Sequence, residues 1–143
     1  MDIKRFVVSV IVGAVTMHAI GYLVFDVATA DFYAANATGL IRDSNLQWSI
    51  ALGNLSLATL LALCIATRSD KPTVAGGLLT GAVVGFLVWC GADFTFYGYE
   101  SRWNLTLTIT DPMLAAIQTA IAGAVIGATQ ARIAGTSKTQ AVV

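Results

Sequence analysis

Four polar side chains interrupt the otherwise apolar stretches of this sequence, and they are the residues with the greatest chemical potential. They are His18, Asn54, Asp93 and Asp111. Two are carboxylates, one is an amide, and one is an imidazole that titrates near neutral pH. Ionisable side chains are costly inside a membrane, so each of them is a candidate for a functional role.

The two aspartates form the most specific pattern. Asp93 and Asp111 each lie nine residues from Arg102, one before it and one after it. If two antiparallel helices flank Arg102, this symmetry brings both carboxylates to the same level. Two carboxylates in a low-dielectric site do not easily ionise together, so we expect one of them to hold a proton near neutral pH. The pair predicts proton handling or cation binding.

The other polar residues are expected to join this pair. At a rise of about 1.5 Å per helical residue, all four lie roughly 10 to 13 Å from the same membrane face. We expect His18 to supply a titrating neighbour or a counter-charge. Asn54, Thr95 and Tyr97 are expected to supply hydrogen bonds.

Each of these residues also has a structural interpretation. Asp111 precedes a proline and has the pattern of a helix N-cap. Asp93 could be hydrated or paired with Arg102, and Asn54 could hold two helices together by a hydrogen bond. His18 could be a satisfied core histidine. The sequence does not show which way these side chains face.

Common metal and cofactor motifs are absent from the sequence. It has one His, and its two cysteines, Cys64 and Cys90, fall at different depths. There is no phosphate-binding loop, dinucleotide fingerprint, nucleophile elbow or paired-cysteine motif. We predict no metal site and assign no cofactor. A carboxylate-bridged metal held by Asp93, Asp111 and His18 is the alternative that remains open.

The elements that must position these residues are membrane helices. The chain has 143 residues, of which 57% are hydrophobic and only 11% charged, whereas about a quarter are charged in soluble domains. Eight basic and eight acidic residues give a formal net charge of zero, which argues against a nucleic-acid partner. The length accommodates four spans of about 20 residues in a single domain, 1–143.

We therefore predict an all-α integral membrane protein with four transmembrane helices. The expected spans are about 6–27, 47–67, 73–98 and 105–134. The fourth helix either starts late, at Asp111-Pro112, or is longer and bends there. Between the first two spans, Phe32 and Tyr33 predict a short interfacial helix, ended near Gly39. Residues 135–143 are expected to form a flexible tail.

Small residues recur at four-residue spacing in the last two predicted spans. They are Gly77, Gly81, Gly85, Gly123 and Gly127. Glycines at this spacing let two helix backbones approach closely in lipid, where packing replaces the hydrophobic effect. We expect these glycines to form helix-packing contacts, within the protein or with a second copy.

Basic residues set the expected orientation. Four crossings place both termini on one side of the membrane. Six basic residues fall on that side and two on the other. The six are Lys4, Arg5, Arg68, Lys71, Arg132 and Lys138, opposed by Arg42 and Arg102. Both termini are therefore predicted to be cytoplasmic. Most aromatic residues fall near the opposite, outer face, where we expect the functional site.

Several short motifs occur along the chain: Asp93 and Thr95 in the third predicted span, then Trp103, Leu105 and Asp111 leading into the fourth, and a Phe32-Tyr33 pair after the first. In these motifs the chain resembles the DUF2177 family of small four-span bacterial membrane proteins. Two positions depart from the family pattern: His18 stands where the family tends to have an aspartate, and Asn104 where it has a proline. The resemblance implies the topology and a bacterial cytoplasmic membrane, and it implies no activity.

The sequence supports three functional hypotheses. The first is a non-enzymatic accessory or assembly subunit, or a small-ligand binder, within the membrane. The second is a proton- or cation-coupled transporter that uses Asp93 and Asp111. The third is an enzyme acting on a lipid-linked substrate, for which no reaction motif is present. The expected partners are lipid and either further copies of the chain or a larger membrane complex.

Overall fold

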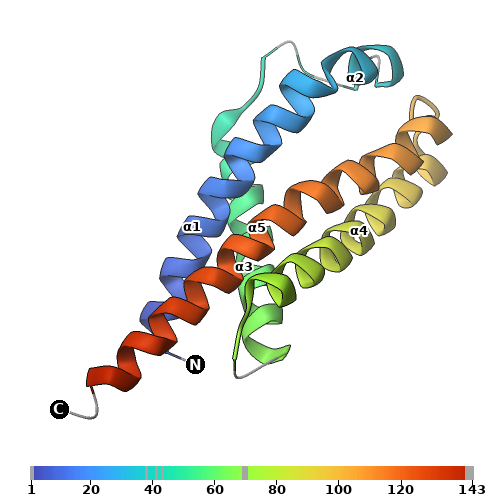
Figure 1. Cartoon of the computed structure of the whole chain (residues 1–143). Coiled ribbons are helices and arrows are strands. Elements are labelled where there is room, and N and C mark those ends of the chain that lie inside the picture. The colour runs from blue at the N-terminus through green and yellow to red at the C-terminus, as the bar shows by residue number, and fades with distance from the viewer. Residues whose placement is uncertain (1, 38, 41, 43, 69–70, 141–143) are drawn as a thin grey trace.

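The computed structural model describes residues 2–37, 39–40, 42, 44–68 and 71–140, without the side chains of 135–140. Its elements are α1 (Ile3–Gly21), the π-helical segment η1 (Tyr22–Ala28), α2 (Ala30–Asn36), α3 (Gln47–Arg68), α4 (Val74–Tyr99) and α5 (Leu105–Gln140). Throughout the described residues the regular structure is helical, as predicted. Figure 1 shows α1, α3, α4 and α5 side by side as an elongated bundle.

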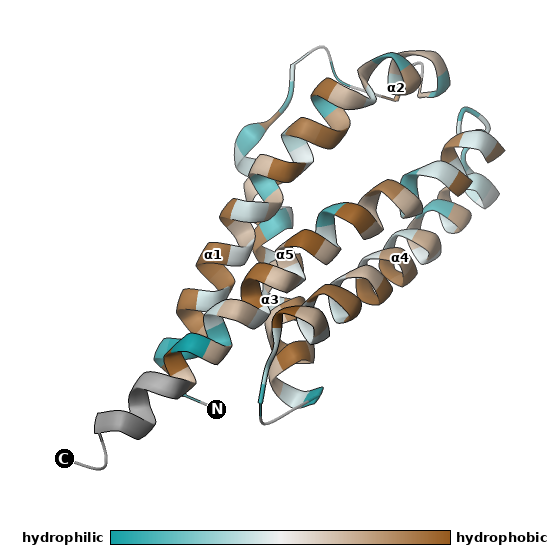
Figure 2. Cartoon of the chain, in the orientation of Figure 1, coloured by the Kyte–Doolittle hydropathy of each residue, from teal (hydrophilic) through white to brown (hydrophobic). Residues whose placement is uncertain are grey.

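Four segments are long and apolar enough to cross a membrane, which confirms the expected number of candidate spans. They are Ile3–Ala28, Gln47–Arg68, Val74–Tyr99 and Leu105–Ala134. Their hydrophobic residues occupy the middle of the bundle, and hydrophilic residues gather toward its ends (Figure 2). Both chain termini lie at the same end of the bundle (Figure 1). We call the opposite end the distal end.

Helix α5 is the central element of the bundle. Within its most apolar window 44% of the residues are buried, against 22% in each of the other three spans. Helices α1, α3 and α5 share one apolar core. Its buried members are Val10, Met17, Ala58, Leu61, Ala62, Ile65, Ala122 and Ile126. These helices therefore pack through interlocking aliphatic side chains.

Helices α4 and α5 pack in a different way, through glycine. A Cβ atom added at Gly77 would overlap the carbonyl of Gly123, and one at Gly81 would overlap the carbonyl of Thr119. A Cβ atom added at Gly127 would likewise overlap the carbonyl of Thr73, the residue just before α4. The two backbones are in direct contact, which is the arrangement that small residues at four-residue spacing permit.

Two glutamine side chains from α5 add polar links across the bundle. The Nε2 atom of Gln118 donates to the carbonyl of Met17 on α1 over 2.7 Å. The Nε2 atom of Gln130 donates to the carbonyl of Ala62 on α3 over 3.1 Å. Both glutamines are buried. Amide groups in a membrane interior need such partners, because lipid offers none.

The fourth span begins at Leu105, so the late start at Pro112 is wrong. Asn104 caps the helix: its Oδ1 accepts from the backbone N–H of Leu107 over 2.8 Å. Pro112 lies inside the helix, where it lacks the N–H that would bond to the carbonyl of Thr108. Asp111 is consequently an interior helical residue, and its carboxylate is free for other contacts.

The distal connections tie the short helix α2 to the α4–α5 turn. Asn104 Nδ2 donates to the carbonyl of Asn36 over 3.0 Å, and Arg102 Nη1 donates to that of Gly39 over 3.1 Å. Helix α2 includes Phe32 and Tyr33 and ends at Asn36, before Gly39, which has a positive φ of 77° that suits glycine. Phe32 and Tyr33, which predicted a short helix here, thus lie in one, and its interfacial position stays a prediction.

The C-terminal segment differs from the expected tail. Helix α5 continues through Gly135 as far as Gln140, so most of the predicted flexible region has a helical backbone. Residues 141–143 lie outside the described part of the chain.

Candidate functional site

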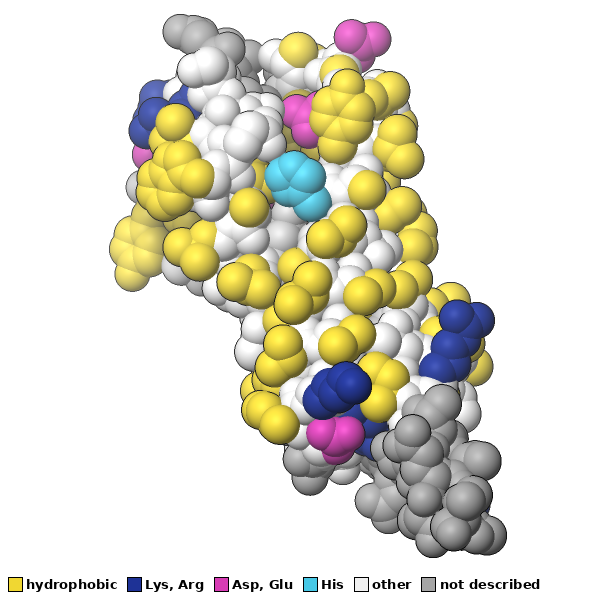
Figure 3. Space-filling view, turned by 90° about the vertical axis from the view of Figure 1, so that its left-hand side faces the viewer, with side chains coloured by type: hydrophobic (Ala, Val, Ile, Leu, Met, Phe, Trp, Pro, Cys, Tyr) yellow, Lys and Arg dark blue, Asp and Glu magenta, His cyan; other side chains and the backbone are white. Residues whose placement is uncertain are grey.

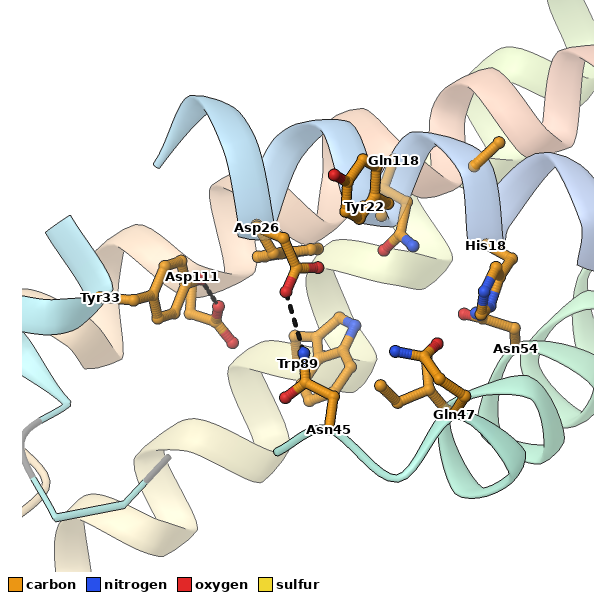
Figure 4. Close-up of a pocket in the computed structure, with 14 residues that line it drawn as sticks. His18, Tyr22, Asp26, Tyr33, Asn45, Gln47, Asn54, Trp89, Asp111 and Gln118 are labelled. Atoms are coloured by element: carbon orange, nitrogen blue, oxygen red, sulfur yellow. Dashed lines mark hydrogen bonds between the residues drawn. The ribbon is translucent and has the colours of Figure 1, made fainter. Parts of the chain in front are cut away.

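A cavity of about 540 Å³ opens in the distal half of the bundle, lined mainly by the first, second and fourth spans and by Trp89 of the third. Its polar and aromatic lining residues are His18, Tyr22, Phe25, Asp26, Tyr33, Asn45, Gln47, Asn54, Trp89, Asp111 and Gln118. Figure 4 shows these side chains converging from helices far apart in the sequence. The volume is in the range of small-molecule sites.

The acidic end of the cavity is built around Asp111. The hydroxyl of Tyr33 donates to Asp111 Oδ1, and the two side chains lie together in Figure 4. Behind Asp111, on α4, lies Asp93, whose carboxyl interacts directly with that of Asp111. The two arms of the α4–α5 hairpin thus place these aspartates side by side.

Asp93 is completely buried. Neither of its carboxylate oxygens has a hydrogen-bond donor within the described residues. Two ionised carboxylates have no proton to share, so their contact becomes a hydrogen bond only when one of them is protonated. Asp93 is therefore a buried hydrogen-bond acceptor, and the carboxyl group of Asp111 is its available partner.

The opposite end of the cavity is formed by His18 and Asn54. The distance between His18 Nδ1 and Asn54 Nδ2 is 3.4 Å, which joins α1 to α3. Both residues line the cavity, and His18 is exposed at its rim. In the space-filling view the single histidine lies at the surface among hydrophobic side chains (Figure 3).

The four residues expected to meet therefore form two separate pairs. His18 and Asn54 lie at one end of the cavity and Asp111 lies at the other (Figure 4). Asp93 interacts with Asp111 and does not line the cavity. The expected depths assumed span ends that differ from those of the structure: the first span continues to Ala28, ten residues after His18, whereas the fourth begins at Leu105, six residues before Asp111. His18 is therefore farther from the distal end of its helix than Asp111 is from the start of α5.

The remaining candidates have other positions. Thr95 is exposed on α4 and donates to the carbonyl of Gly91 in its own helix over 2.6 Å. Tyr97 is also exposed, and neither residue lines the cavity. Arg102 pairs with Glu100 over 3.1 Å, which replaces the suggested pairing with Asp93.

A bridging metal is not supported by this arrangement. Among the described residues, no group of three or more His, Cys, Asp or Glu side chains could hold a metal ion. His18 lies at the far end of the cavity from Asp111 (Figure 4). Cys64 and Cys90 are free thiols.

Most of the lining residues were not among the sequence-based candidates, and Asp26, Trp89 and Gln118 are three of them. Gln118 lies seven residues after Asp111, on the same face of α5, and Trp89 lies four residues before Asp93 on α4. Spacings of seven and four residues place Gln118 and Trp89 on the same helix faces as the two aspartates, so the sequence could have indicated both residues as neighbours of the site. Asp26 accepts from Asn45 over 3.0 Å, a contact that only the folded loop creates.

Local packing holds Tyr33 in place against Asp111. Its ring makes edge contacts with Phe25, at a centroid distance of 5.7 Å, and with Phe32, at 5.4 Å. Burial raises the pKa of the Tyr33 phenol far above its usual range, and the hydrogen bond to Asp111 and its negative charge act in the same direction. Tyr33 is therefore a stable hydrogen-bond donor.

The π-helical segment η1 contributes Tyr22, Phe25 and Asp26 to the wall. At its end Thr29 N–H bonds to the carbonyl of Val24, five residues earlier, over 3.0 Å. This wider winding changes which side chains share a face, and such segments are common at functional sites.

In comparisons with known proteins, no protein-family model, no curated protein and no solved structure matches this chain. The resemblance to DUF2177 remains a prediction from the motifs.

Proposed function

We propose that this chain is a non-enzymatic integral membrane protein that binds a small ligand in its distal cavity. The observation that carries the proposal is the cavity itself, about 540 Å³ in volume and lined by both aromatic and polar side chains. If the bundle had a purely structural role, side chains would be expected to fill this space, because voids in a core are destabilising. The polar groups at both ends suit a ligand with defined orientation.

We place the protein in a bacterial cytoplasmic membrane with both termini in the cytoplasm. The distribution of basic residues supports this orientation. In this orientation the cavity lies in the outer half of the membrane. The exposed apolar side chains along all four spans would contact lipid, further copies of the chain or a larger membrane complex.

The test compares two tryptophan substitutions on α1. Ala19 lines the cavity, whereas Val15, one turn earlier, is 65% exposed and does not line it. Ala19→Trp fills the cavity, and Val15→Trp places the same ring on the outer surface. We expect native mass spectrometry of the detergent-purified protein to find a co-purifying small molecule in the wild type and in Val15→Trp, and to find it lost in Ala19→Trp.

Two outcomes would reject ligand binding. One is retention of the same bound species in all three proteins. The other is a stoichiometric protein partner with no small molecule, which would make the chain an accessory subunit.

A second candidate function is proton-coupled transport, which the Asp93–Asp111 pair supports. The buried Asp93 lacks a hydrogen-bond donor, and a proton held between the two carboxyls would satisfy it. Asp93→Asn imitates the protonated acid but cannot release a proton. We expect it to fold normally and to abolish proton movement in vesicles that contain a pH-sensitive dye. Thr95→Val, on the exposed face of the same helix, is the matched control.

A further inference from the structure

The chemistry of the cavity wall indicates which class of ligand it accepts. Two carboxylates, Asp26 and Asp111, line the cavity, and no Lys or Arg is among the lining residues. The basic group nearest to the cavity is His18, at the opposite end from Asp111 (Figure 4). Among the described residues, the acidic end of the wall therefore has two carboxyl groups and no cationic side chain.

Neither carboxylate has an ion-pair partner within the described residues. Asp26 accepts one hydrogen bond, from Asn45 over 3.0 Å, and Asp111 accepts one from Tyr33. Both donors are neutral groups, which orient a carboxylate without cancelling its charge. Asp111 is half-buried, where the lower dielectric strengthens its attraction to a cation, whereas Asp26 is exposed and adds a second carboxylate to the wall.

Aromatic rings complete this part of the wall. Tyr22, Phe25 and Trp89 line the cavity together with the two carboxylates. The face of an aromatic ring attracts a cation within about 6 Å, and tryptophan does so most strongly. Rings next to carboxylates are the combination that recognises ammonium groups with an apolar body.

We propose that the cavity binds a substituted ammonium ion, with its charge between Asp26 and Asp111 and its apolar body against the aromatic rings of the wall. This inference rests on the proposed ligand-binding function and names its ligand class. A bare metal ion does not fit the same wall, because rings offer it no ligand atoms and only two lining carboxylates are present.

The test uses choline and its neutral isostere 3,3-dimethylbutan-1-ol, in which carbon replaces the charged nitrogen. Both keep the same shape and the hydroxyl group, so they differ in charge alone. We expect the full-length protein in lipid nanodiscs to bind radiolabelled choline, unlabelled choline to displace it, and the neutral isostere not to displace it. This comparison requires no variant.

Two charge-matched variants then locate the site. Asp26→Asn removes one negative charge from the cavity wall, and we expect it to weaken choline binding about tenfold. Glu100→Gln removes one negative charge at the same end of the protein, but Glu100 pairs with Arg102 and does not line the cavity. We expect Glu100→Gln to leave choline binding unchanged.

The outcomes separate this inference from the proposed function. Equal displacement by the neutral isostere overturns the ammonium ligand but leaves the cavity as a ligand site. Equal weakening in Asp26→Asn and Glu100→Gln places the cation elsewhere and overturns the assignment. If choline does not bind at all, the inference is overturned, and the comparison of Ala19→Trp with Val15→Trp still decides whether the cavity binds anything.

Discussion

Tyr33 is the residue whose chemistry depends most on its surroundings. It lies on the short helix α2, outside the candidate spans, and its ring is held against Phe25 and Phe32. Burial first, and then the hydrogen bond to Asp111, raise the pKa of its phenol far above the usual value. Because the folded-state pKa is raised, the contribution of Tyr33 to stability is complete below about pH 10, the unfolded pKa. It is lost as the pH rises above that value.

We predict that Tyr33 does not ionise in the folded protein at moderately alkaline pH. The chain has four tyrosines. In an ultraviolet absorbance titration up to about pH 11, wild type and Tyr33→Phe should therefore give the same tyrosinate signal. In denaturant, the wild type should show the signal of one additional tyrosine. A smaller signal in folded Tyr33→Phe than in folded wild type would contradict the prediction.

Gln118 is the second residue that connects structure with function. Its amide bonds to the carbonyl of Met17 over 2.7 Å, and it also lines the cavity. Gly21 makes room for it, since a Cβ atom at that position would lie 2.5 Å from Gln118 Nε2. The small residue on α1 and the amide on α5 therefore belong to one contact.

Gln118→Leu should destabilise the protein by about 1 kcal/mol, the usual value of an interhelical hydrogen bond in a membrane. The measurement is unfolding by a denaturing detergent, without added ligand. Ser56→Ala is the control, because Ser56 is exposed and bonds only to Leu52 within its own helix. Equal stability of Gln118→Leu and wild type would show that the amide adds nothing across the α1–α5 interface.

At the scale of elements, the α4–α5 hairpin is held by direct backbone contact. Its helices touch through backbone atoms along Gly77, Gly81 and Gly123, so no side chain can adjust to added volume. Helices α1 and α3 instead meet α5 through aliphatic side chains, which can repack. The rigid hairpin carries both Asp93 and Asp111 and so maintains the contact between them.

Gly81→Ala should therefore destabilise the protein by about 1–3 kcal/mol through overpacking. Gly91→Ala, on the same helix, is the matched control because no atom lies within 4 Å of its added Cβ. Alanine is the better helix former, so Gly91→Ala should be neutral or slightly stabilising. Thermal unfolding in detergent measures both. Similar melting temperatures for the two variants would contradict direct backbone contact at Gly81.

At the scale of the whole molecule, the bundle has two chemically different ends. Both termini lie at one end, and the distal end carries the cavity and the linked α2 and α4–α5 turns. Four apolar helices of sufficient length connect the two ends. This arrangement predicts opposite accessibility of the two ends in a membrane.

Single cysteines introduced into a background without Cys64 and Cys90 should reveal this arrangement. Lys4→Cys and Arg132→Cys are exposed near the termini, and Ser101→Cys is exposed at the distal turn. A membrane-impermeant thiol reagent added to intact cells should label Ser101→Cys only. The first two should react after the cells are opened. Labelling of all three in intact cells would reject four crossings with shared termini.

The sequence by itself determined the secondary structure class, the candidate spans and the small-residue spacing in α4 and α5. The physical reason is that lipid imposes local requirements: about 20 apolar residues per helix, internally satisfied backbone groups, and glycine wherever backbones touch. Each requirement can be recognised in a short stretch of sequence. Asp93 and Asp111 were also recognisable as a pair, because each lies nine residues from Arg102 in the connection between the last two spans.

Only the tertiary structure decided how the polar residues are grouped. It separated His18 and Asn54 from the aspartates, brought Tyr33 onto Asp111 from 78 residues away, and added Gln118 to the cavity. Side-chain direction depends on helix rotation and length, and on the π-helical winding of η1, none of which has a local signature in sequence. The hydrophobic pattern specifies which helices form, but contacts between distant segments specify the site.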